Sequence, residues 1–123
     1  MTDETPVPSI DVRAAESRLR AGEDPTPILL DVREPHEFTG GRATGATHMP
    51  LSTLGPRIGE LPRDRPVFVI CHSGGRSAMV TGYLLANGWT DVHNVSGGMI
   101  AWEFHKLPTR SGPTDPSELT LPG

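Results

Sequence analysis

The sequence predicts an α/β fold with a mainly parallel sheet. Short apolar runs that are typical of buried strands alternate along the chain with segments whose apolar residues recur at helical spacing. Such alternating units are expected to form a parallel sheet through right-handed crossovers. The predicted strands are 28–32, 46–49, 67–70 and 92–95, and the predicted helices are 12–20, 34–38, a short helix within 50–62, 77–86 and 99–104.

The first predicted helix covers 12–20, where Val12, Ala15 and Leu19 lie at helical spacing. Ser9 is its expected N-cap, because a serine hydroxyl can accept a hydrogen bond from the first turn. The Gly and Pro residues that follow are stop signals.

The next predicted strand, 28–32, is apolar except for Asp31 near its carboxyl end, which suits a strand buried on both faces. Pro35 then indicates the start of a single helical turn over 34–38, because proline is favoured at the first position of a helix. The segment 40–45 is too rich in Gly for regular structure, and 46–49 is a second short strand.

The second half of the chain repeats the alternation. Residues 67–70 are apolar throughout and lead into a Gly-rich loop, 71–77. A helix follows as far as the stop signal at 87–88. The strand 92–95, a glycine turn and the amphipathic helix 99–104 complete the predicted fold.

Chain length predicts one domain over residues 1–107, because 123 residues supply a single hydrophobic core. Residues 108–123 are rich in Pro, Ser, Thr and Gly and have little to bury. We therefore predict a disordered tail over 108–123.

Charge and hydropathy argue against two classes of partner. A net charge of -4 leaves no basic surplus for nucleic acid. Apolar runs are far shorter than the roughly 20 residues that cross a bilayer, so no membrane partner is predicted. The amino terminus has neither a basic nor an apolar signal region, which makes the cytoplasm the expected location.

Cys71 is the only cysteine, which excludes an internal disulfide and a multi-cysteine metal site. It follows a predicted strand and opens a Gly-rich loop, whose backbone N–H groups can surround a thiolate and lower its pKa. Gly74 and Gly75 permit such a backbone path. Arg76 adds a cation, and Ser77 adds a helix cap or a hydroxyl donor. The alternative is a simple turn beside a buried, inert cysteine.

The spacing Cys-x4-Arg separates two chemistries. Tyrosine phosphatases and dual-specificity phosphatases use Cys-x5-Arg, whose wider loop fits a tetrahedral phosphate. A ring that is one residue shorter fits a single terminal sulfur better. The loop therefore favours sulfur transfer over dephosphorylation, and no general acid is evident for a leaving alkoxide.

Four segments together resemble the motifs of the rhodanese-like family. They are LDVREPHEF (30–38), GATHMP (45–50), CHSGGRS (71–77) and VSGGMIAW (95–102). Their order and spacing extend the resemblance over about 28–107.

The resemblance implies a central, mainly parallel five-stranded sheet flanked by helices on both faces, and a persulfide on Cys71. It implies thiosulfate or a persulfide as donor. Asp31 and Arg33 are implied to brace the active loop, and Trp102 to lie in the core. The substrate-binding residues that it implies are His72, Ser73, Gly74, Gly75, Arg76 and Ser77.

The chain departs from the family where members usually have GHI-x-GA, because residues 41–46 read GRATGA. Arg42 is either a solvated loop charge or a cation at the pocket mouth that favours anionic donors. His72 is either simply exposed or tunes the thiolate. The other histidines lack metal-ligand spacing.

Three functions remain open. The first is a ping-pong sulfurtransferase that requires no metal or organic cofactor and passes sulfur to cyanide, a thiol or a protein. With no second cysteine in the chain, the acceptor must be external. The second is a persulfide-carrying or regulatory interaction module with little turnover, and the third is a cysteine-based phosphatase or arsenate reductase.

Overall fold

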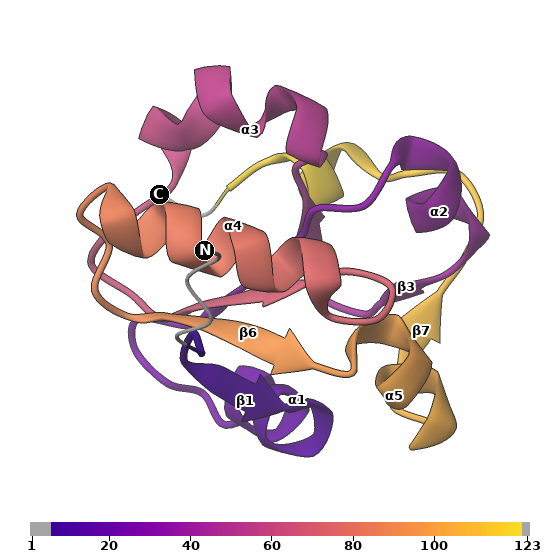
Figure 1. Ribbon diagram of the computed structural model, residues 1–123. Coiled ribbons are helices and arrows are strands. Elements are labelled where there is room, and N and C mark those ends of the chain that lie inside the picture. Colours follow the sequence, from indigo (N-terminus) through magenta and orange to yellow (C-terminus); the bar gives the residue numbers. More distant parts are fainter. Residues whose placement is uncertain (1–5, 122–123) are drawn as a thin grey trace.

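The computed structural model describes residues 6–121 of the chain. Its central sheet has five parallel strands in the order β1-β6-β5-β2-β4 (Figure 1). These strands are β1 (Ser9–Asp11), β2 (Ile28–Asp31), β4 (Ala46–His48), β5 (Val67–Ile70) and β6 (Val92–Ser96). The α/β class and the five-stranded parallel sheet are therefore confirmed.

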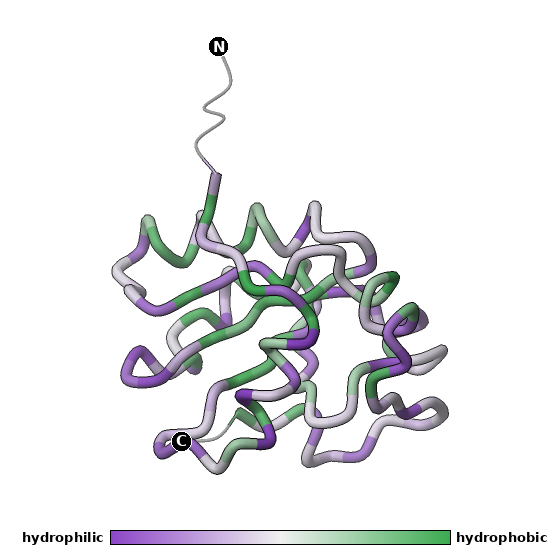
Figure 2. The backbone as a smooth tube through the Cα atoms, turned by 90° about the horizontal axis from the view of Figure 1, so that it is seen from below, coloured by the Kyte–Doolittle hydropathy of each residue, from purple (hydrophilic) through white to green (hydrophobic). Residues whose placement is uncertain are grey.

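Helices cover both faces of this sheet, with α1 and α5 on one side and α3 and α4 on the other (Figure 1). Leu29 of β2 belongs to the first hydrophobic core together with Trp102, whereas its neighbour Leu30 belongs to the second together with Leu84. Figure 2 shows green hydrophobic segments running through the middle of the fold. The helices are α1 (Val12–Arg20), α2 (Pro35–Gly40), α3 (Leu51–Arg57), α4 (Gly75–Ala86) and α5 (Gly98–Phe104), with the short 3-10 turns η1 (Ile58–Glu60) and η2 (Pro116–Leu119).

The amino-terminal strand β1 differs from the sequence prediction. Ser9 pairs with Asn94 at the edge of the sheet and does not cap α1. The N-cap is Asp11, whose Oδ1 accepts a hydrogen bond of 2.8 Å from the amide of Ala14. A strand of three residues is too short for its alternation to be recognised, so the prediction of Ser9 as the cap was wrong.

The carboxyl-terminal segment corrects the prediction of disorder, because residues 109–119 pack on the domain. Strand β7 (Thr109–Arg110) pairs antiparallel with β3 (Arg42–Ala43), and η2 follows. Glu118 of η2 forms a two-pronged ion pair with Arg42, with Nη2 and Oε1 2.8 Å apart. Both side chains are buried.

The structure contradicts both of the roles that were predicted for Arg42 from the sequence. Its side chain is fully buried, so it is not a solvated loop charge or a cation at a pocket mouth. Besides Glu118, it donates hydrogen bonds to the carbonyls of Phe38, Gly112 and Pro113. Composition could not reveal this partner, since the two side chains are 76 positions apart in sequence.

Among residues 6–121, none of the helices has both the length and the apolar character that a membrane span requires.

Candidate active site

The loop that begins at Cys71 lies at the centre of the carboxyl edge of the sheet. It follows β5, which is the middle strand, and β2 brings Asp31 beside Ile70 in register. Gly74 has a φ of 106°, a left-handed conformation that suits glycine and turns the chain into α4. The helix starts at Gly75, two residues before the predicted start. Carboxyl edges of this kind are the usual ligand sites of parallel sheets.

The sulfur of Cys71 is surrounded by hydrogen-bond donors. The amides of Gly74 and Ser77 donate to Sγ over 3.2 and 3.3 Å, and the Ser77 hydroxyl oxygen lies 3.2 Å from Sγ. Cys71 itself is only 1% exposed. The loop thus forms an inward-facing nest around one sulfur atom.

These contacts decide the ionisation of the thiol. Burial by itself raises the pKa of the Cys71 thiol, because it disfavours the charged form. The hydroxyl and amide of Ser77 and the amides of Gly74 and Ser73 outweigh burial and hold the pKa below its ordinary value. A lowered pKa increases the thiolate fraction at neutral pH, and the thiolate is the nucleophilic form.

The glycine pair after β6 supports the loop from its carbonyl side. In the first turn of α5, the amides of Met99 and Ile100 donate to the carbonyls of Cys71 and His72 over 2.9 and 3.1 Å. Gly98 has a φ of 55°, and a Cβ there would lie 2.4 Å from the Cys71 carbonyl oxygen. The carbonyls are therefore held outward, which leaves the amides free to face the sulfur.

Replacing Gly98 by alanine should therefore disturb the loop directly. We expect Gly98→Ala to lower the free energy of unfolding by roughly 2–3 kcal/mol, because overpacking adds to the strain of a left-handed residue. Chemical denaturation would measure this loss in the free energy of unfolding. Gly22→Ala is the matched control, since Gly22 has a φ of 74° but nothing within 4 Å of a Cβ. Equal losses in both variants would show that the close approach to the loop is unimportant.

Arg76 is engaged by an acidic partner. Its Nη1 and Nη2 lie 2.8 and 2.9 Å from the two carboxylate oxygens of Glu37 on α2. The Arg76 guanidinium lowers the pKa of Glu37 to about 2, so that carboxylate stays charged throughout the neutral range. The predicted cation of the loop is thus largely neutralised by this pair.

A second pair lies beneath the loop. Arg33 binds the Asp31 carboxylate through Nε and Nη2, with the closest contact at 2.8 Å, and both side chains are buried. The same Nη2 donates to the carbonyl of Gly41 over 2.8 Å. The pair therefore ties the end of β2 to the segment that follows α2.

Two residues with direct contacts at this site were not singled out from the sequence. Glu37 lies within the LDVREPHEF motif, but its partner Arg76 is 39 positions away. Asn94 contacts both Ser77 and the carbonyl of Gly74. A signal for Asn94 was present, because the alternation of a strand places this polar residue on the same face of 92–95 as the apolar Val92. His72 and Ser73, in contrast, are exposed.

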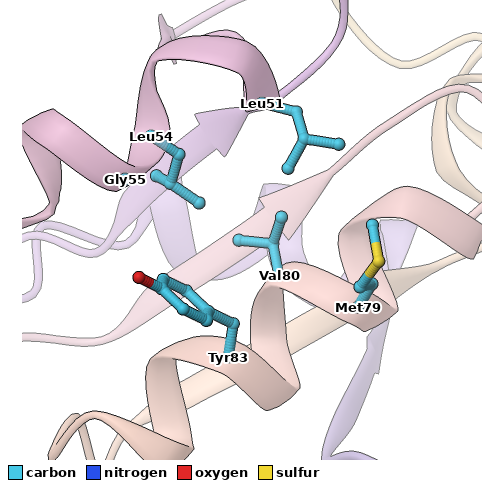
Figure 3. Close-up of a pocket in the computed structure, with 6 residues that line it drawn as sticks. All are labelled: Leu51, Leu54, Gly55, Met79, Val80 and Tyr83. Atoms are coloured by element: carbon cyan, nitrogen blue, oxygen red, sulfur yellow. The ribbon is translucent and has the colours of Figure 1, made fainter.

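A cavity of about 320 Å³ opens beside the loop. It is lined by Arg33, Glu37, Gly40, Gly41, His72, Met99 and Glu103. A second cavity of about 250 Å³ lies between α3 and α4, where the leucines of α3 face Val80 and Met79 of α4 (Figure 3). The second cavity is lined mainly by apolar side chains and by Tyr83, whereas the first is lined by His72 of the loop and by charged side chains. The cavity beside the loop is therefore the candidate substrate approach.

Fold and site together define a parallel α/β domain built around a cysteine in an amide-lined loop. The rhodanese-like domain family matches residues 11–105, and the chain belongs to that family. A sulfurtransferase from Allochromatium vinosum is 38% identical over 102 residues, which is 83% of this chain and 94% of the relative. The thiosulfate sulfurtransferase GlpE of Pseudomonas putida is 32% identical over 73% of this chain and 78% of its own.

A solved structure supports the same assignment. The crystal structure of a rhodanese-related protein from Thermoplasma volcanium superposes with a TM-score of 0.72 at 28% identity. The match covers 84% of this chain and 97% of that protein.

Proposed function

We propose that this protein is a sulfurtransferase that carries a sulfane sulfur on Cys71. The observation that carries the proposal is the nest itself, in which two amides and a hydroxyl converge on one buried sulfur. Membership of the rhodanese-like family and the names of its sulfurtransferase relatives support the reaction class. Thiosulfate or a persulfide is the proposed donor.

The proposed reaction has two half-steps. The Cys71 thiolate attacks the outer sulfur of thiosulfate, the S–S bond of the donor breaks, and sulfite leaves with the bonding electron pair. An acceptor such as cyanide then attacks the outer sulfur of the persulfide. Thiocyanate forms and the electron pair returns to Sγ, so the thiolate is regenerated.

The loop and the residues beneath it have proposed parts in this cycle. The nest stabilises the anion before and after loading, because preorganised amides cost no reorganisation. Asp31 and Arg33 brace the loop from below. The proposed substrate-binding residues are His72, Ser73, Gly74, Gly75, Arg76 and Ser77. The chain contains one cysteine, so an external thiol, cyanide or protein must take the sulfur.

The first test uses the purified protein with thiosulfate and cyanide. We expect intact mass to increase by one sulfur after donor is added, and thiocyanate to form catalytically. Failure of both signals with several donors, in protein shown to be folded, would overturn the proposal. Hydrolysis of an aryl phosphate would instead indicate phosphatase chemistry.

The low exposure of Cys71, 1%, favours a second candidate function. A buried sulfur is shielded from small thiols in solution, which suits a persulfide carrier that delivers its cargo to a protein docked on the loop. A carrier would gain one sulfur stoichiometrically and form little thiocyanate. The same experiment therefore separates the two functions.

The pair between Arg76 and Glu37 leads to a prediction about anionic donors. In Glu37→Gln, the side chain keeps an oxygen to accept from the Glu34 amide but loses its charge. Arg76 then adds a net positive charge near the loop. We expect the KM for thiosulfate to fall roughly 3- to 10-fold at low salt, and less at high salt.

Glu60→Gln is the matched control, because it releases Arg57 from an equivalent two-pronged pair. Steady-state thiocyanate assays at two salt concentrations would compare the variants. An unchanged or higher KM in Glu37→Gln would contradict a role for this pair in donor selection.

A further inference from the structure

The Ser77 hydroxyl lies between two groups that both compete for its single proton. Its oxygen is 3.2 Å from the sulfur of Cys71 and 2.5 Å from Oδ1 of Asn94 on β6. An amide oxygen can only accept a hydrogen bond, whereas the hydroxyl has one proton to donate. Ser77 can therefore donate to the sulfur or to Asn94, but not to both.

The amide of Asn94 is held in one orientation. Its Nδ2 donates to the carbonyl of Gly74 over 3.3 Å, which directs Oδ1 toward Ser77. A flipped amide would bring Oδ1 against the Gly74 carbonyl, where two acceptors would face each other. Asn94 is 8% exposed, so solvent offers its oxygen little alternative.

The competition has different outcomes in the two forms of Cys71. In the free thiolate the negative charge is on Sγ and attracts the Ser77 proton. Oδ1 of Asn94 then lies close to Oγ of Ser77 with no proton between the two oxygens. In the persulfide the charge is on the outer sulfur, and Sγ becomes a weak acceptor. The Ser77 proton can then return to Asn94, so their hydrogen bond is better satisfied in the loaded protein.

We propose that Asn94 is a positioning residue that draws the Ser77 hydroxyl toward itself as Sγ loses charge, and so promotes the loading of Cys71 with sulfur. The proposal rests on the sulfur-transfer function proposed above and adds a residue that acts through Ser77. As Sγ loses its negative charge during the attack, the hydrogen bond from the Ser77 hydroxyl to Oδ1 of Asn94 strengthens, and this lowers the free energy of the transition state.

Asn94→Leu tests the proposal through two changes in opposite directions. Without the competing oxygen, Ser77 serves the thiolate alone, and the pH midpoint for alkylation by iodoacetamide should fall by about 0.5–1. The rate of sulfur loading from thiosulfate should fall about 10-fold. This rate would be measured by intact mass at a pH above the alkylation midpoints of both the native protein and Asn94→Leu. A merely structural loss of the nest would raise the midpoint instead.

The decisive control is the same substitution in a Ser77→Ala background. If Asn94 acts through the hydroxyl, Asn94→Leu should change neither the midpoint nor the loading rate there. The Gly74 carbonyl keeps its bond from the Ala78 amide, at 3.1 Å, in all variants. The charged or titratable groups around the sulfur also remain, namely His72, Arg76 with Glu37, and Asp31 with Arg33.

The outcomes distinguish this proposal from the function on which it rests. A raised midpoint in Asn94→Leu, or effects that persist in the Ser77→Ala background, would overturn the role of Asn94. A native protein that takes up no sulfur from any donor would overturn the proposed function, and the alkylation midpoints would still report on the Ser77 hydrogen bond.

Discussion

Cys71→Ser is expected to abolish sulfur uptake and to reduce thiocyanate formation by at least about 10³-fold. The hydroxyl of serine has a far higher pKa than a thiol, and among residues 6–121 no general base contacts Sγ to activate it. The donors around Sγ are backbone amides and the Ser77 hydroxyl, which stabilise a preformed anion but do not act as a general base. The nucleophile must therefore already be ionised, and the lowered pKa of the Cys71 thiol meets this requirement in the native protein.

Intact mass with thiosulfate and a steady-state thiocyanate assay would measure both parts of this expectation. Serine is close in size to cysteine, so circular dichroism and the Tm should show that the fold persists. Retained turnover would mean that sulfur moves without a covalent intermediate on residue 71. Retained mass gain would place the sulfur on another side chain.

The geometry of the loop 71–77 could be predicted from sequence because its parts are local. Cys71, two glycines and Ser77 all lie within the short segment 71–77, and the strand before it and the helix that begins at Gly75 fix the direction of the amides. The same local reading predicted the buried strands at 28–32 and 67–70. Alternation of strands and helices was enough to predict the fold class.

The long-range polar contacts could not be predicted in the same way. Glu37 and Arg76 are 39 positions apart, and Ser77 and Asn94 are 17 apart on different elements. Nothing in the local pattern says which charged or amide group a side chain meets across the sheet edge. Arg76 was therefore expected as a cation for the substrate, whereas the structure pairs it with a carboxylate.

The tail shows the same limit at the level of the fold. Residues 108–123 have the composition of a disordered segment, but one buried ion pair and one short antiparallel pairing hold residues 109–119 against the domain. Composition averages over a segment, whereas Glu118 acts as a single anchor. The buried charge of Arg42 and the order of the tail therefore have one common explanation.

Glu118→Gln should consequently destabilise the protein strongly. Removing one partner of a buried ion pair typically costs about 3–5 kcal/mol, because the other charge is left uncompensated. The Arg42 guanidinium lies 2.8 Å from Oε1 of Glu118 in a fully buried position, and glutamine cannot neutralise it. Denaturant-induced unfolding at pH 7 would measure the loss as a lower transition midpoint.

The effect should also depend on pH in a defined direction. Arg42 lowers the pKa of Glu118 below its ordinary value of 4.5, so the stabilisation is complete above that pH and is lost as the pH falls through the lower folded pKa. The difference between the native protein and Glu118→Gln should therefore shrink in acid. Glu60→Gln is the matched control, since Glu60 is 55% exposed and solvent screens its pair with Arg57, so that this substitution should change the stability little. Equal losses in the two variants would mean that the tail is not anchored by the Arg42–Glu118 pair, and that other contacts, such as the β3–β7 pairing and the bond from the Gly112 amide to the Thr39 carbonyl, hold residues 109–119 in place.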